Sequence, residues 1–124
     1  MGVWGADNFA NDTALDYVHK LVDQMIAQVE RTVVSPQMMR PDEPESTRMM
    51  CNIELMWLIG RHARLSMMES AKVEDWKAKY LAVWDRSIDG LLGPNPKPGV
   101  KAERRAAIVE SFDRLIALCK SQEQ

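Results

Sequence analysis

The run MMCNIELMWLI at residues 49–59 decides the fold of this chain. In a helix, at about 100° per residue, its apolar side chains cover almost the whole circumference. A helix of this kind needs neighbours on most of its sides, so we expect it to be the most buried element. It is too short to cross a membrane, which takes roughly 20 apolar residues. The run therefore predicts a central core helix with other helices packed around it.

Glu54 is the only charged residue in this run. A buried carboxylate is costly unless it is hydrogen-bonded or paired with a cation. We expect Glu54 to be a structural acceptor, whose partner is either the backbone N–H groups of residues 4–11 or an arginine. The alternative that stays open is a catalytic carboxylic acid.

Length and composition are those of one globular domain, spanning residues 1–124. The chain is 46% hydrophobic and 27% charged, with a formal net charge of −2. This charge gives no reason to expect nucleic-acid binding, which usually needs a basic face. The first residues lack the basic start and apolar run of a signal peptide, so we expect a cytoplasmic protein without a membrane segment. In that compartment Cys51 and Cys119 are expected to be free thiols, although a single disulfide stays open.

Helical spacing of apolar residues recurs in four segments, separated by loops rich in proline and glycine. It predicts helices at 12–31, 46–63, 71–91 and 101–120, with a loop at 1–11. No segment shows the alternation of a strand. The predicted fold class is therefore all-α, a four-helix bundle-like domain with an ordered N-terminal loop.

The N-terminal loop holds two large apolar residues, Trp4 and Phe9. We expect both to pack on the bundle and tie the loop down as a structural clasp. Asn11 or Asp12 is the predicted N-cap of the first helix, and Ser70 that of the third, because short polar side chains accept the first free backbone N–H bonds.

The pattern Trp4-Gly5-x-x-x-Phe9-x-Asn11-Asp12-x-Ala14-Leu15-Asp16 resembles the start of an uncharacterised bacterial domain family. Members of that family often have a glycine near the position of Ala6 and a proline before the phenylalanine; this chain has Asp7 and Asn8 there. Similarity continues through Glu54 and the region around Trp76 and Trp84. The resemblance implies a protein of unknown function, of a kind suspected to be immunity proteins that neutralise bacterial toxins.

One triple of side chains has the spacing of metal ligands. Asp16, His19 and Asp23 share one face of the first predicted helix. The di-iron bundle pattern needs further glutamates and a second Glu-x-x-His motif, which are missing here. We therefore interpret the triple as a solvated polar face, and we expect neither a metal nor a cofactor.

Catalytic motifs are also missing: the chain has no nucleophile elbow, Walker loop or dinucleotide-binding glycine pattern. We therefore expect a non-enzymatic binding protein whose partner is a protein toxin. The alternatives are a small enzyme using Asp16, His19, Asp23 or Glu54, and a nucleic-acid-associated factor using a basic cluster at Lys97, Lys101, Arg104 and Arg105. Two sets of charged residues are predicted to contact the partner, with a slight preference for the acidic set because it complements a basic cleft: Asp16, Asp23 and Glu30, or Lys97, Arg104 and Arg105.

Overall fold

Four α-helices make up the computed structural model, which describes residues 8–64 and 68–123. They are α1 (Asp12–Val33), α2 (Pro44–Gly60), α3 (Ser70–Ser87) and α4 (Val100–Gln122), and a short 3-10 helix, η1 (Ile88–Gly90), follows α3. The described residues contain no strand, so the all-α prediction is confirmed.

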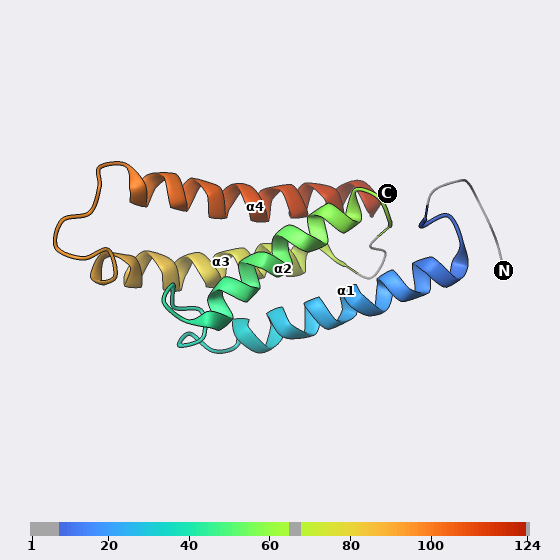
Figure 1. The fold of residues 1–124 in the computed structure, drawn as a ribbon, viewed down its shortest axis with the longest axis horizontal. Coiled ribbons are helices and arrows are strands. Elements are labelled where there is room, and N and C mark those ends of the chain that lie inside the picture. Colours follow the sequence, from blue (N-terminus) through green and yellow to red (C-terminus); the bar gives the residue numbers. More distant parts are fainter. Residues whose placement is uncertain (1–7, 65–67, 124) are drawn as a thin grey trace.

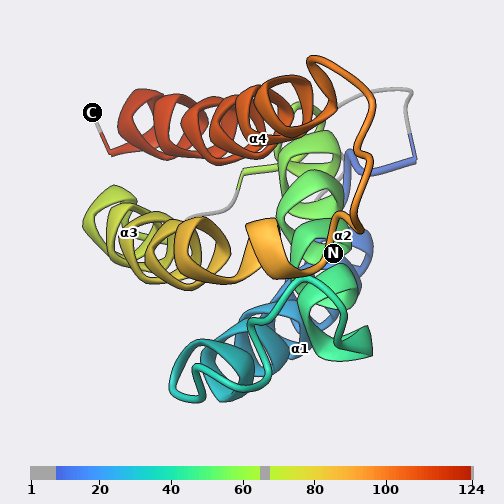
Figure 2. The same cartoon turned by 90° about the vertical axis from the view of Figure 1, so that its left-hand side faces the viewer.

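The helices are arranged around α2 (Figure 1). It crosses the molecule obliquely and packs against α1 on one side and α4 on the other, while α3 packs mainly on α4. Figure 2 shows α3 and α4 running side by side, with α2 linking that pair to α1. The side chains of the core are apolar and come from all four helices; the largest fully buried ones are Trp76, Trp84, Phe112, Met49, Ile53 and Met56.

Most helix ends lie within three residues of their predicted positions. α1 begins as expected, because the Asn11 side chain accepts a hydrogen bond from the Ala14 backbone N–H at 2.8 Å. α2 begins at Pro44, a residue suited to a first turn because it has no N–H to leave unpaired. The predicted extension of α2 to residue 63 is wrong: the helix ends at Gly60, a poor helix former. The third helix ends at Ser87 rather than 91, and the tighter 3-10 turn of η1 continues the chain from Ile88 to Gly90.

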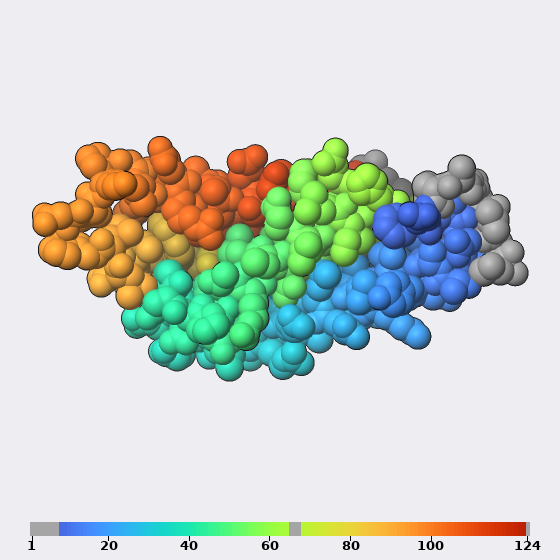
Figure 3. All heavy atoms as spheres, in the orientation of Figure 1, coloured from blue at the N-terminus to red at the C-terminus, as the bar shows by residue number. Residues whose placement is uncertain are grey.

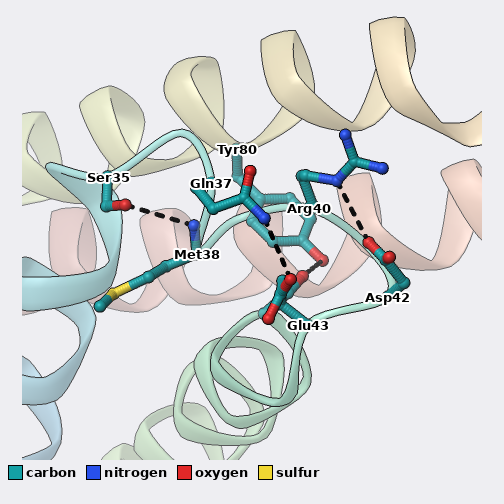
Figure 4. A network of polar contacts seen from close by, with 8 residues as sticks. Ser35, Gln37, Met38, Arg40, Asp42, Glu43 and Tyr80 are labelled. Atoms are coloured by element: carbon teal, nitrogen blue, oxygen red, sulfur yellow. Dashed lines mark hydrogen bonds and ion pairs between the residues drawn. The ribbon is translucent and has the colours of Figure 1, made fainter.

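The connection between α1 and α2 is held by its own polar side chains (Figure 4). Gln37 donates to a Glu43 carboxylate oxygen at 3.1 Å, and Arg40 pairs with Asp42 at 3.4 Å. Below them, the Tyr80 hydroxyl of α3 hydrogen-bonds the Ser46 hydroxyl at 2.8 Å. These contacts fix the start of α2 against both the connection and α3.

The predicted N-terminal clasp falls partly outside the described residues, because Trp4 lies in 1–7. Phe9 is half-buried and packs against the core, as expected. Asp12 is the first residue of α1 and not its cap.

Candidate partner-binding surface

The outward face of α2 carries an apolar stripe made by Cys51, Leu55 and Leu58. These residues follow helical spacing, and all three are exposed, Leu55 by 43% and Leu58 by 42%. Figure 3 shows α2 at the surface between α1 and α4. The expectation of burial all round is therefore wrong in part, because the packing of α1 and α4 leaves one arc of α2 open.

Trp57 lies at the edge of this stripe, toward α4, and contacts two arginines. The guanidinium carbon of Arg114 lies 4.2 Å from the Trp57 ring centroid, and that of Arg61 lies 4.9 Å from it. Cation–π contacts of this kind hold extended arginine side chains in place. Tryptophan and arginine are enriched among the interface residues that contribute most to the binding energy. A half-buried tryptophan beside two arginines is therefore a candidate for such a position.

Glu54 contacts one of its two predicted kinds of partner, an arginine. Its carboxylate accepts a hydrogen bond from Arg114 of α4 at 2.7 Å. The Glu54 side chain is 41% exposed, so it lies at the boundary of the buried face and not within it. The expectation of a buried carboxylate is therefore wrong, and the ion pair joins α2 to α4 at the surface. The other predicted partners at residues 4–7 lie outside the described part of the chain.

The acidic set predicted on the first helix lies along one side of α1. Asp16, Asp23 and Glu30 are exposed and share that side through their spacing. Glu30 forms an ion pair with Lys72 of α3 at 3.1 Å. Within residues 8–64 and 68–123, Asp16 and Asp23 form no ion pair, so their charges face solvent.

The basic set lies near the other end of the molecule, at the start of α4. Lys97 and Arg104 are exposed, whereas Arg105 makes two hydrogen bonds with the Asp85 carboxylate, at 2.8 and 3.0 Å. Neighbouring Lys101 is paired with Asp89 at 2.8 Å. Two of the four basic residues, Lys101 and Arg105, are therefore already paired with carboxylates of the protein. A phosphate backbone would have to displace these carboxylates to bind both residues.

The possible metal triple is not assembled. His19 donates from Nε2 to the backbone carbonyl oxygen of Arg64 at 2.9 Å, which connects α1 to the turn after α2. In the part of the chain that the structure describes, no three His, Cys, Asp or Glu side chains are grouped as metal ligands. His19 is a structural contact in this arrangement.

Both cysteines are free thiols, in two very different settings. Cys51 is exposed on the apolar stripe, whereas Cys119 is buried in the core. Burial, together with the charge of Glu123, raises the pKa of the Cys119 thiol to about 11. Only Cys51 is therefore open to thiol reagents at neutral pH.

Leu55 and Leu58 are the surface residues that sequence reasoning missed. Their apolar character was interpreted as burial because a single sequence does not say which side of a helix lacks a neighbour. A usable signal was present: Arg48 lies on the same helical face seven residues before Leu55, and Arg61 and His62 follow the apolar run directly. Polar residues at both ends of an apolar row indicate that the row meets solvent.

Among the described residues, no helix is both long enough and apolar enough to cross a lipid bilayer. No curated protein and no solved structure matches this chain significantly. One family model does match, over residues 2–121: the domain of unknown function DUF4259. Because the match covers nearly the whole chain, this protein belongs to the DUF4259 family.

Proposed function

We propose that this protein is a non-enzymatic binding protein, and that it acts as an immunity protein that neutralises a bacterial toxin by direct contact. The apolar stripe at Cys51, Leu55 and Leu58 carries the first half of this proposal, because it lies exposed on the central helix. The N-terminal resemblance described above supports the second half.

The stripe has the composition that protein interfaces favour at their centres. Two exposed leucines on adjacent turns form an apolar patch, and the Trp57–Arg114 contact lies at its rim. A stable interface buries roughly 800 Å² on each partner, more than the stripe alone provides. The contact therefore extends onto the flanking sides of α1 and α4.

The acidic side of α1 is the second surface that could hold a toxin. Asp16 and Asp23 have no ion pair in the described chain, so a basic cleft in the partner could take both carboxylates. Contacts of this kind mainly raise the association rate and fix the orientation of the partner. The stripe and the acidic side make different predictions for the same experiment.

If the neighbouring gene encodes a toxin-like protein, co-expression with that protein tests the proposal. Growth rescue and a stable complex are expected with the natural sequence. Leu55→Asp places a charge at the centre of the stripe and should abolish both. Val100→Asp is the matched control, because Val100 is a similarly exposed apolar residue, 39% exposed, at the distant start of α4. Thermal melts of both variants check that they remain folded.

Cys51 supplies a direct footprint of the interface. A maleimide should label Cys51 and leave Cys119 unreacted, and complex formation should slow that labelling strongly. If Asp16→Asn with Asp23→Asn abolishes rescue while Cys51 labels at the free rate in the complex, the acidic side of α1 is the interface instead. Failure of the folded protein to bind or protect removes immunity as its function.

A further inference from the structure

A groove of about 420 Å³ lies between α1 and α2, beside the apolar stripe. Its volume is within the range of pockets that bind small ligands or single side chains. α1, α2 and Met38 of their connection line it with the following residues: Gln28, Arg31, Thr32, Met38, Glu45, Arg48, Met49 and Asn52.

Two arginines in this lining, Arg31 and Arg48, are without acidic partners in the described part of the chain. Eight of the sixteen lysines and arginines form ion pairs in the described residues, and these two belong to the other half. Arg31 comes from α1 and Arg48 from α2, so the packing of the two helices brings both charges to one groove. Glu45 supplies one negative charge there, which leaves the lining with a net positive charge.

The remaining walls are built to hold a ligand with both a polar end and an apolar stem. Asn52 is 8% exposed and donates to the Gln28 side-chain oxygen at 3.1 Å, which fixes both amides. Met49 is buried at 1% exposure, and Met38 is 40% exposed at the groove. Methionine side chains adapt readily to an incoming apolar group.

We infer that this groove receives an acidic side chain, Glu or Asp, from the protein partner, with the carboxylate held by Arg31 and Arg48. Guanidinium groups match carboxylates in charge and shape and bind them through paired hydrogen bonds. The inference rests on the proposed function for its choice of a protein ligand. Arg48 supports that choice, because it lies one turn before Cys51 on the same helix face and joins the groove to the apolar stripe. A partner segment with an acidic residue next to leucine-like residues fits both features.

A short peptide tests the groove without the toxin. The probe is acetyl-Leu-Glu-Leu-amide, and acetyl-Leu-Gln-Leu-amide is its neutral counterpart. At millimolar concentration, the glutamate peptide should shift the NMR signals of the Arg31 and Arg48 guanidinium groups and of the Asn52 side-chain amide. The glutamine peptide should bind about tenfold more weakly, because it lacks the charge-assisted hydrogen bonds.

Variants then assign the binding to the groove. Arg31→Gln and Arg48→Gln should each weaken the glutamate peptide about tenfold, and Glu45→Gln should tighten it by removing the opposing charge. Arg86→Gln is the matched control, since Arg86 is an exposed arginine of α3 with no ion pair in residues 8–64 and 68–123. It should leave the affinity unchanged.

Three results would overturn the inference: equal binding of the two peptides, shifts confined to other residues, or no shift at all. Inorganic phosphate is the competing arm, because phosphate also suits two arginines. If phosphate binds the groove more tightly than the glutamate peptide, the site serves a phosphorylated ligand and the carboxylate proposal is wrong. Because no toxin is present, a negative result here leaves the growth-rescue test of immunity standing, and a failed rescue leaves this test standing.

Discussion

Two grooves run between neighbouring helices of this molecule, and they differ in how their charges are used. The groove between α3 and α4 has a volume of about 580 Å³, and ion pairs bridge it, Lys77 to Asp113 at 2.7 Å and Lys120 to Glu74 at 3.3 Å. The groove between α1 and α2 is smaller, and its two arginines have no acidic partner in the described residues. Ion pairs within the protein neutralise the charges of the first groove. The lining of the second groove keeps a net positive charge, which an acidic group of a partner can neutralise.

The side chains packed beneath the two grooves also differ in type. Tyr80 of α3 and Phe112 of α4 pack ring to ring at 5.8 Å, in an interface of buried aromatic residues. Between α1 and α2, the side chains packed in the core are aliphatic, and a hydrogen bond from Asn52 to Gln28 joins the two helices at the groove. We infer that the α3–α4 groove serves stability, whereas the α1–α2 groove, above an equally buried core, is open to a partner.

The largest effect is expected at Phe112, which is fully buried. Phe112→Ala should lower the free energy of unfolding by about 3–5 kcal/mol, because it removes a large side chain from a close-packed core. Arg48→Gln in the other groove should stay within about 0.5 kcal/mol of the natural protein. Urea unfolding of both variants measures the difference. Comparable losses at the two sites would contradict the division between a stabilising and a binding groove.

The next largest effect is expected for the hydroxyl pair of Tyr80 and Ser46, which joins α3 to α2. Tyr80→Phe should cost about 1–3 kcal/mol, because it leaves the Ser46 hydroxyl buried without its partner. The double variant with Ser46→Ala should cost less than the sum of the two single changes, since both remove one interaction. Tyr17→Phe is the control, because Tyr17 is 63% exposed. Additive losses in the unfolding free energies would show that the hydrogen bond contributes little.

Much of this architecture follows from local pattern. The apolar spacing predicts four helices and the position of each, and the Asn11 cap is confirmed because a cap depends only on residues next to it. The sequence narrows the partner of Glu54 to an arginine or the backbone N–H groups of the N-terminal loop. Choosing Arg114, sixty positions away, requires knowing how α4 packs on α2.

The candidate site was less predictable, for a related reason. Leu55 and Leu58 resemble core residues in the sequence, and they are exposed because no helix covers the side of α2 between α1 and α4. Arg31 and Arg48 lie seventeen positions apart on different helices and meet only through packing. The predicted cap at Ser70 is wrong for the same reason: Ser70 is the first residue of α3, and Glu123 from the end of α4 accepts its N–H.

A smaller effect on the free energy of unfolding should distinguish the paired charges of the α3–α4 groove from the unpaired arginines of the α1–α2 groove. Lys77→Gln breaks the ion pair with Asp113 and should cost about 0.2–1 kcal/mol, as exposed pairs do. Arg31→Gln breaks no ion pair in the described chain and should cost less in the same unfolding assay, since it loses only the interaction of its charge with the C-terminal end of α1. The difference should shrink in high salt, which screens exposed pairs. A larger loss for Arg31→Gln would mean that this arginine stabilises the fold and is not held ready for a partner.

The smallest effect is expected at the end of α4, where the contact between α3 and α4 becomes dependent on pH. The Glu123 carboxylate accepts the Ser70 backbone N–H at 2.7 Å and the Ser70 hydroxyl at 3.2 Å. These hydrogen bonds hold the pKa of Glu123 below its ordinary value of 4.5. Because the folded pKa is lowered, the stabilisation is fully present above 4.5 and is lost as the pH falls through the folded value. Glu123→Gln should therefore lower the melting temperature at neutral pH, and this loss should fade in strong acid.

Glu110→Gln is the control: Glu110 is an exposed glutamate of α4 without an ion pair in the described residues, and it should give no such pH-dependent loss. A loss for Glu123→Gln that is the same at neutral and acid pH would show that the carboxylate charge does not cap α3.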